Sequence, residues 1–295
     1  GVEGHVYESQ PALQLEKRIN AANLPYAKVV SALIDDGYQR IDWQIDFKSG
    51  YRWSEKTKSH RIEYGHLPGV DVKIPWELAR MQHLPQLAFA YNIEKNEAYV
   101  QEFRNQILDF IANNPPRFGV NWSCTMDVGI RIANWLMAYD LFRGYGAKFD
   151  KEFEKVFISS VYDHGVHIIS HLEWFPTFRS NHYLANIGGL IYVAAYLGHE
   201  EWFDLSVIEL IKELPLQFHE DGSSFEGSTS YHCLSAQIFA YATQLAVKKK
   251  GKEVFPDWYF ERMEKMAQFV SHITKPNGEI VQIGDHDSGY FFRLS

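Results

Sequence analysis

The sequence has few cysteines and no long apolar run. Cys124 and Cys233 are the only two cysteines among 295 residues, so we expect neither a disulfide framework nor a cysteine-based metal motif. No segment approaches the roughly 20 apolar residues of a membrane-spanning helix, and the opening GVEGHVYESQ does not resemble a signal peptide. We therefore expect no membrane partner, and these features assign no cellular compartment.

The chain also lacks an excess of basic residues. Its 29 Lys and Arg against 37 Asp and Glu give a net charge of −8, which argues against nucleic-acid binding. A polyanionic substrate stays possible, because a groove can be locally basic on an acidic protein. Aromatic residues are abundant at 15%, and such rings line carbohydrate clefts as well as large hydrophobic cores.

Helical periodicity dominates from about residue 75 onward, where apolar residues recur at spacings of three and four. Before residue 75 and after about residue 278, short polar and aromatic runs predict β-type or extended segments. Helices joined by short connections pack as antiparallel hairpins, so we predict an all-α layered or circular array. The predicted helical segments are 75–92, 128–146, 153–174, 181–198, 200–218, 231–250 and 258–274.

Three polar stretches lie beside these helical segments, mostly at their N-terminal ends. They read RSNHYLANIGGL (179–190), DGSSFEGSTSYHCL (221–234) and IGDHDSGY (283–290). An array of helical hairpins collects such ends on one face, so we expect them to converge on one cleft. Helix N-termini favour anions, and the small residues of the second stretch let the backbone pass close to a ligand. The pattern points to a carboxylate-bearing substrate.

An Asn, a His and a Tyr suit the cleavage of a glycosidic bond beside a uronic acid by β-elimination. Asn181 and His182 can neutralise the carboxylate and so make the neighbouring C5 proton acidic. Tyr231 can protonate the leaving oxygen or act as the base. Each residue also has a structural alternative, since Asn181 could cap a helix, His182 could be a core histidine and Tyr231 a half-buried tyrosine.

Together, RSNHYLANIGGLIYV, DGSSFEGSTSYHCLSAQ and QIGDHDSGYFFRL resemble the helical domain of the heparinase II/III and alginate lyase superfamily. The resemblance extends over about residues 40–295 and implies a polysaccharide lyase with an incomplete (α/α) toroid. By motif, Asn181 matches the carboxylate-neutralising asparagine and His182 a histidine that assists it. Tyr231 matches the catalytic tyrosine, which is expected to protonate the leaving O4 and could also act as base.

The resemblance also implies residues that bind the substrate or orient the site. Glu77 and Arg80 could instead form a buried ion pair, His232 could support Tyr231, and Asp285 and His286 could simply shape a turn. The predicted residues of this class are Glu77, Arg80, Arg131, Glu226, His232, Asp285 and His286.

We read residues 1–295 as one toroid domain, in which residues 1–74 form an extended and helical lead-in. In the superfamily an antiparallel β-sandwich follows the toroid and completes the cleft, and we expect that domain to be absent from this chain. The predicted partner is an acidic polysaccharide. Because side chains can neutralise the carboxylate, we expect the reaction to require no cofactor and no metal.

Other readings stay open. His164, His167 and His171 have the spacing of a helical zinc site, which Asp163 could join. A glycoside hydrolase on a similar helical barrel would use two carboxylates, for which Asp127, Glu226 and Asp285 are available. A third reading is a non-catalytic protein that binds a glycan or takes part in polysaccharide biosynthesis.

Overall fold

The computed structural model describes residues 14–176, 179–287 and 289–294. Within these ranges the regular secondary structure is helical, and the only β-type pairings are isolated bridges. The prediction of an all-α fold is therefore confirmed. The α-helices are α1 (Leu15–Arg18), α2 (Leu24–Ser31), α3 (Lys73–Ala79), α4 (Leu84–Glu94), α5 (Ala98–Asn113), α6 (Thr125–Gly144), α7 (Lys151–Ser170), α8 (Asn181–Leu197), α9 (Glu200–Gln217), α10 (Thr229–Lys250) and α11 (Asp257–Ile273), and the 3-10 helices are η1 (Ser59–Arg61), η2 (Val120–Trp122) and η3 (Lys252–Val254).

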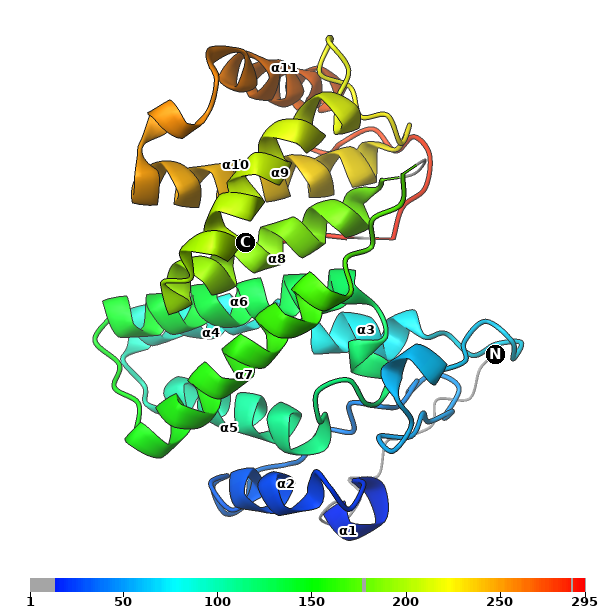
Figure 1. The fold of residues 1–295 in the computed structure, drawn as a ribbon, viewed down its shortest axis with the longest axis vertical. Coiled ribbons are helices and arrows are strands. Elements are labelled where there is room, and N and C mark those ends of the chain that lie inside the picture. The colour runs from blue at the N-terminus through cyan, green and yellow to red at the C-terminus, as the bar shows by residue number, and fades with distance from the viewer. Residues whose placement is uncertain (1–13, 177–178, 288, 295) are drawn as a thin grey trace.

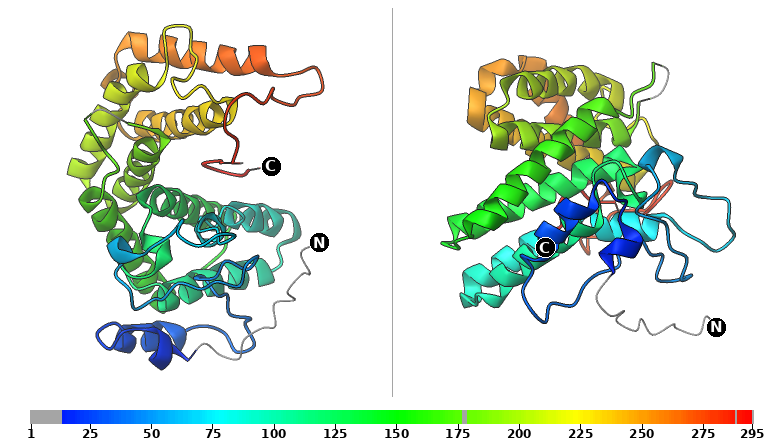
Figure 2. Two further views of the ribbon diagram at one scale, coloured as in Figure 1. Left: turned by 90° about the vertical axis from the view of Figure 1, so that its right-hand side faces the viewer. Right: turned by 60° about the horizontal axis from the view of Figure 1, so that its bottom comes forward.

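The long helices form two rows that follow an open arc (Figures 1 and 2). Helices α4, α6, α8 and α10 pack side by side in this order, and α5, α7, α9 and α11 pack along them. Consecutive helices run in opposite directions, because short loops join them. This arrangement is the predicted incomplete toroid, and it brings the N-terminal ends of α6, α8 and α10 to the same side of the inner row.

Two glycines set the spacing between α6 and α8. A Cβ atom added to Gly129 would lie 2.5 Å from the carbonyl oxygen of Ala185, and one added to Gly189 would lie 2.5 Å from the Cα of Gly129. Only glycine allows backbones to approach this closely. The contact therefore holds the first turns of these two helices, which carry candidate site residues, in a fixed relation.

The C-terminal segment lies in the gap of the arc (Figure 2). It begins beside α10, where the backbone N–H of Thr229 donates to the carbonyl of Ile283 at 3.0 Å. It ends beside α6, where Nδ2 of Asn134 donates to the carbonyl of Phe291 at 2.8 Å. The segment therefore runs from α10 to α6, past α8.

The structure departs from the predicted elements in three respects. The segment 75–92 divides into α3 and α4, with Met81 at a φ of 52° between them. Pro85 explains the break, because proline lacks an N–H and its ring clashes with the carbonyl four residues earlier. Helix α5 was not among the predicted segments, and the expected extended regions form only isolated bridges, such as Ile45 with Arg52 and Thr274 with Ile280.

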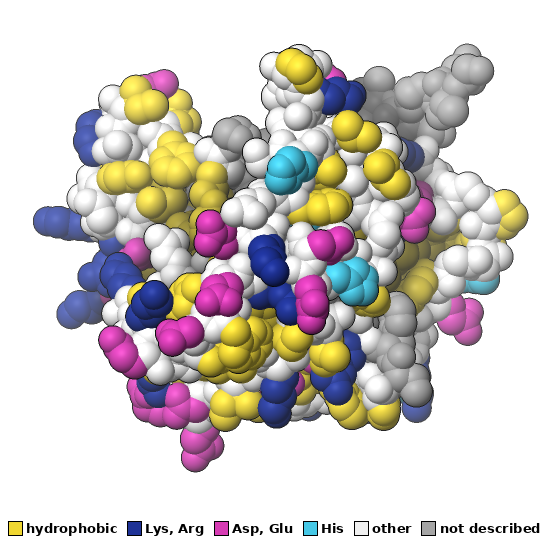
Figure 3. Space-filling model, turned by 90° about the horizontal axis from the view of Figure 1, so that it is seen from above, with side chains coloured by type: hydrophobic (Ala, Val, Ile, Leu, Met, Phe, Trp, Pro, Cys, Tyr) yellow, Lys and Arg dark blue, Asp and Glu magenta, His cyan; other side chains and the backbone are white. Residues whose placement is uncertain are grey.

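The surface above α11 mixes charges of both signs (Figure 3). Lysine and arginine side chains alternate with aspartate and glutamate there, so the net charge of −8 does not appear as one acidic field on this face. No helix in the described ranges combines the length and the apolar character that a bilayer crossing requires.

Candidate active site

A pocket of about 440 Å³ lies where the N-terminal ends of α6, α8 and α10 meet α3. Its wall contains five of the predicted site residues and four other ionisable groups. The predicted residues are Asn181, His182, Tyr231, Glu226 and Arg80, and the additional ones are Lys73, Cys124, Asp127 and Asp287. The convergence expected for the stretches 179–190 and 221–234 is present in this pocket.

Asn181 is held by Glu226 and does not cap its helix. Ser180 is the N-cap of α8, and its side chain accepts from the backbone N–H of His182. The two carboxylate oxygens of Glu226 accept from the backbone N–H of Asn181 at 2.8 Å and from its Nδ2 at 2.7 Å. A carboxylate at a helix N-terminus is favourable, and the second hydrogen of Nδ2 is left for a ligand.

His182 is accessible and paired with an acid. Its side chain is 44% exposed, so it is not a core histidine, and its Nδ1 lies 3.0 Å from Oε1 of Glu173. Burial of the ring alone would lower the pKa of His182, but the hydrogen bond and the negative charge of Glu173 outweigh it, and the pKa is raised. The pair therefore favours the protonated imidazolium, which can donate from both ring nitrogens.

Glu173 is itself held in place from two sides. Its Oε2 accepts from the backbone N–H of Met126 at 2.7 Å and from Nδ2 of Asn186 at 3.0 Å. Its own backbone N–H donates to Oδ1 of Asn186 at 2.8 Å. These bonds tie Glu173 to both α6 and α8, and they leave Oε1 as the atom that faces His182.

Tyr231 enters the pocket from the first turn of α10. Ser228 caps this helix, since its Oγ accepts from the backbone N–H of Tyr231 at 3.1 Å. The phenol donates to Oδ2 of Asp287 at 3.3 Å, and Lys73 Nζ lies 3.8 Å from the same oxygen. Partial burial, followed by the charge of Asp287, raises the pKa of Tyr231 to about 12. The phenol is therefore protonated at neutral pH.

Arg80 is paired with an acid other than the one expected. Its Nε lies 2.5 Å from Oδ1 of Asp127, while the other oxygen of that carboxylate is buried with no hydrogen bond to the described residues. Glu77 is half-buried near Arg80 and outside the pocket wall, and burial raises its pKa. The alternative of a Glu77–Arg80 ion pair is therefore wrong in its partner, because Asp127 lies closer to the guanidinium.

Comparisons with known proteins place the chain in a family. A family model described as the heparinase II/III N-terminus matches residues 7–289. The chain belongs to this family. Similar proteins include a heparin-sulfate lyase of Bacteroides stercoris, with 24% identity over 73% of this chain and 35% of that protein, and one of Pedobacter heparinus, with 23% identity over 88% and 39%.

Solved structures show the same fold for this heparinase II/III N-terminal chain. A crystal structure of heparinase III aligns with a TM-score of 0.60 and 22% identity, over 92% of this chain and 42% of that one. A heparan sulfate lyase HepC from Pedobacter heparinus aligns with a TM-score of 0.56 over 92% and 41%. The chain thus spans well under half the length of the relatives that it matches.

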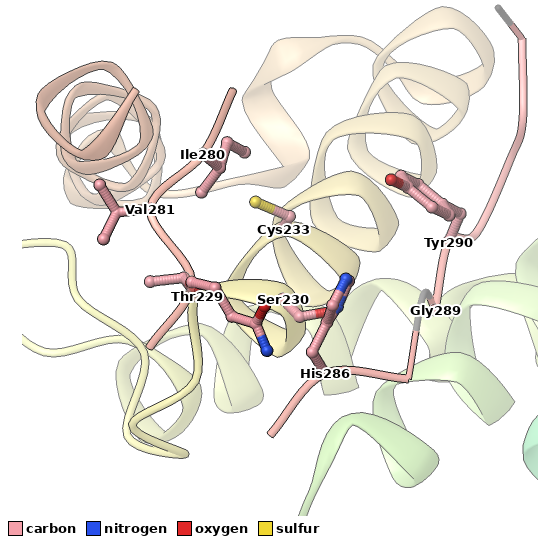
Figure 4. Close-up of a pocket in the computed structure, with 9 residues that line it drawn as sticks. Thr229, Ser230, Cys233, Ile280, Val281, His286, Gly289 and Tyr290 are labelled. Carbon is pink, nitrogen blue, oxygen red and sulfur yellow. The ribbon is translucent and has the colours of Figure 1, made fainter. Parts of the chain in front are cut away.

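Asp285 and His286 lie outside the wall of the candidate active site of this heparinase II/III N-terminal chain. The backbone carbonyl of Asp285 accepts from Oγ of Ser228 at 2.6 Å, and Nδ1 of His286 lies 3.0 Å from Oγ of Ser230. His286 lines a neighbouring pocket of about 170 Å³ between α10 and the C-terminal segment, shown with Cys233 in Figure 4. Instead, the next acid along the chain, Asp287, reaches Tyr231.

Arg131 and His232 are buried beneath the site. Arg131 is 0% exposed, donates to Nε2 of His164 at 3.0 Å and to the carbonyl of Asn121 at 3.1 Å, and does not line the pocket. His232 is 1% exposed, and its Nε2 lies 3.2 Å from the carbonyl oxygen of Met266 in α11. The structure therefore brings neither residue to the cleft, although His232 anchors the turn that carries Tyr231.

The histidines of α7 do not converge on a common point. His164 has both ring nitrogens occupied, by Arg131 and by the carbonyl of Ser160 at 2.7 Å. His167 is buried and stacks on His171 with ring centroids 4.4 Å apart. In the described part of the chain, His164 and His167 are buried, His171 is exposed, and the three do not form a metal-ligating group, so the zinc reading of this helix face finds no support.

Four groups of the site were not predicted: Lys73, Cys124 and Asp287 line the pocket, and Glu173 lies beside His182. Asp287 belongs to the GDHDSG stretch, where the choice among neighbouring polar residues depends on the turn. Glu173 follows α7 in HLEW, and its place beside His182 depends on how α7 and α8 pack. Sequence periodicity carries no signal for either relation.

Proposed function

We propose that this protein acts, in its longer form, as a polysaccharide lyase that cleaves a uronic-acid-containing glycan by β-elimination. The observation that carries the proposal is the convergence of Asn181, His182 and Tyr231 on one pocket from α8 and α10. The names of the relatives, which are heparin-sulfate lyases, support the same reaction class.

The first step is the neutralisation of the substrate carboxylate. The free Nδ2 hydrogen of Asn181 and the imidazolium of His182 are adjacent donors at the N-terminus of α8, where the helix dipole also favours an anion. Hydrogen bonds to the carboxylate strengthen as negative charge moves onto it during removal of the C5 proton. These two residues therefore stabilise the enediolate-like transition state.

The second step is protonation of the leaving group. Elimination breaks the C4–O4 bond, forms the C4–C5 double bond, transfers the C5 proton to a base and leaves an oxygen that needs a proton. We propose that the domain of the longer protein that completes the cleft supplies this base. Tyr231 carries its proton at neutral pH, because its pKa is about 12, so we assign it the role of acid. The carboxylate of Asp287 accepts from its hydroxyl and orients it.

Glu226 and Arg80 act on the site through other residues. Glu226 holds Asn181 by both its backbone and its side chain, so we assign it a positioning role. Arg80 is 7% exposed and neutralises Asp127, which would otherwise repel an acidic substrate from the pocket. We further propose that a β-sandwich domain of the longer protein forms the other wall of the cleft, as in the superfamily.

The test is an absorbance screen of the longer protein against uronic-acid polysaccharides, beginning with heparan-type chains because of the relatives' names. A lyase creates a C4–C5 double bond that absorbs in the ultraviolet, and a hydrolase creates reducing ends without this absorbance. New reducing ends without absorbance would contradict the proposal in favour of hydrolysis. Retention of a glycan without any cleavage would favour the non-catalytic reading.

A further inference from the structure

Three potential metal ligands from separate elements meet on one wall of the candidate active site. Sγ of Cys124 lies 3.7 Å from Oε1 of Glu173 and 4.0 Å from Nδ1 of His182, and the latter two atoms are 3.0 Å apart. All three atoms lie within 4.8 Å of one another, and this is the one such group of three His, Cys, Asp or Glu residues within the described ranges.

The spacing of these atoms suits a tetrahedral ion. Zinc binds sulfur at about 2.3 Å and nitrogen or carboxylate oxygen at about 2.0–2.2 Å, so neighbouring ligand atoms of a tetrahedral site lie about 3.3–3.6 Å apart. The three observed separations of 3.0, 3.7 and 4.0 Å lie within a few tenths of an ångström of this range. A mixed sulfur, nitrogen and oxygen set is typical of zinc, whereas calcium and magnesium take oxygen ligands.

The surrounding structure holds the ligands in place. Cys124 is the N-cap of α6, His182 lies in the first turn of α8, and the two helices are locked at their glycine contact. Met126 and Asn186 bind Oε2 of Glu173 and leave Oε1 toward the cluster. Such supporting hydrogen bonds orient the ligands of natural metal sites.

We propose that Cys124, Glu173 and His182 form a binding site for zinc, with the fourth position open to the pocket. Cys124 and His182 both line the pocket, so an ion can reach them from solvent. Binding releases the thiol proton of Cys124 and the proton on Nδ1 of His182 to solvent, because the metal takes both positions. The ion and the hydrogen bond between His182 and Glu173 therefore exclude each other.

The binding test uses the chain without an affinity tag and a chromophoric chelator that competes for zinc. We expect one zinc ion per chain, and with cobalt in its place an absorption band from a cobalt–thiolate bond. Cys124→Ser should remove the band and weaken zinc binding by about 100-fold or more, because loss of a ligand exceeds the usual cost of losing a supporting hydrogen bond. Cys233→Ser is the matched control and should keep the cobalt–thiolate band and the wild-type zinc affinity.

The proposal is overturned if the wild-type chain binds zinc no better than Cys124→Ser, or if the cobalt–thiolate band disappears in Cys233→Ser instead. If Cys124→Ser does not fold, Glu173→Gln replaces it and should weaken zinc binding while keeping the thiolate band. None of these readouts needs enzymatic activity.

A consequence for catalysis rests on the proposed function. Zinc on Nδ1 of His182 would break the hydrogen bond to Glu173 that holds this ring, and the bound ion would compete with Nε2–H for the substrate carboxylate. In the longer protein we expect zinc to inhibit the lyase and a chelator to restore it. If zinc binds through Cys124 and leaves the rate unchanged, the metal site stands and the role proposed for His182 is wrong.

Discussion

Asp127 and Arg131 lie one helical turn apart on α6 and occupy opposite environments. Asp127 lines the pocket and pairs with Arg80, whereas Arg131 is sealed behind it against His164 and the rings of Phe110 and Trp122. Residues four apart share a helix face, so the position along the axis of α6 determines which side chain faces the pocket and which faces the core. The first turn borders the cleft, and the second already belongs to the core.

The two environments do different work. Burial lowers the pKa of Arg131 to about 9 and lowers that of its acceptor His164 well below the usual value, which keeps this imidazole neutral. A buried polar group is costly unless it is hydrogen-bonded, so the sealed cluster contributes to stability through its pairing. In the pocket the side chains of His182 and Lys73 are 44% and 54% exposed, so a ligand can reach the pocket even though Asp127 itself is buried. Four substitutions test this contrast.

Tyr231→Phe should have the largest effect. Loss of the phenolic proton donor should lower kcat of the longer protein by about 1,000-fold, within the usual range for general acid catalysis. Stability should change by no more than about 0.5 kcal/mol, because the hydroxyl makes one long hydrogen bond. The measurements are the ultraviolet absorbance rate and a urea titration.

Tyr290→Phe is the control for this substitution, since Tyr290 lies in the neighbouring pocket and is 38% exposed. It should keep the full rate. Equal rates for Tyr231→Phe and wild type would remove Tyr231 from the proposed mechanism.

Arg131→Met should have the opposite signature. It removes the donors to His164 and Asn121 and leaves these buried acceptors unpaired, so the free energy of unfolding should fall by about 3 kcal/mol. The activity per folded molecule should stay within about threefold of wild type, since the side chain does not reach the pocket. Urea unfolding and kinetics on the folded fraction check both parts.

Arg143→Met, an exposed position of the same helix that stacks on Tyr139, should cost less than about 1 kcal/mol. If Arg131→Met instead folds as stably as wild type and is inactive, Arg131 belongs to the site and the contrast fails.

Glu226→Gln should lower kcat/KM by about 100-fold, because small displacements of a positioned group cost about this much. The amide puts a donor where the carboxylate accepts from the N–H and Nδ2 of Asn181. Glu220→Gln, an exposed position in the same connection, should have no effect. A wild-type rate for Glu226→Gln would show that Asn181 needs no such support.

His167→Phe should have the smallest effect of the four substitutions, and the effect should appear in how the free energy of unfolding changes with pH. Burial first, and then the charge of His171, lowers the pKa of His167 to about 3. The unfolded state, with a pKa of about 6.5, therefore binds more protons between pH 6.5 and 3, and wild-type stability falls on acidification through this window. Phenylalanine should remove about 2 kcal/mol of the loss between pH 7 and 4.5.

The difference between wild type and His167→Phe isolates the contribution of His167 from that of other titrating groups. Burial raises the pKa of Asp109 to about 6, which acts with the opposite sign but is common to both chains. Urea unfolding at pH 7, 6 and 4.5 provides the slopes. Equal slopes of unfolding free energy against pH for wild type and His167→Phe would mean that His167 is protonated to the same extent in the folded and the unfolded states.

Much of the fold was predictable because it depends on local patterns. Periodicity located α6 to α11, and short connections implied hairpins and hence an array. The break between α3 and α4 is explained by Pro85, but predicting it requires knowing where Pro85 lies relative to the ends of the helix. Asn181, His182, Tyr231 and Glu226 were predictable because helix ends collect on one face and their motifs resemble a known family.

The sequence by itself thus determined helices α6 to α11, their order and the polar character of the helix ends that meet in the pocket. Only the tertiary structure decided which polar groups reach the pocket: Asp287 rather than Asp285 or His286, Glu173 beside His182, and Asp127 rather than Arg131. The physical reason is that periodicity describes one helix at a time. Access to a cleft depends on the spacing between helices, which the contact of Gly129 and Gly189 sets across 60 residues of chain.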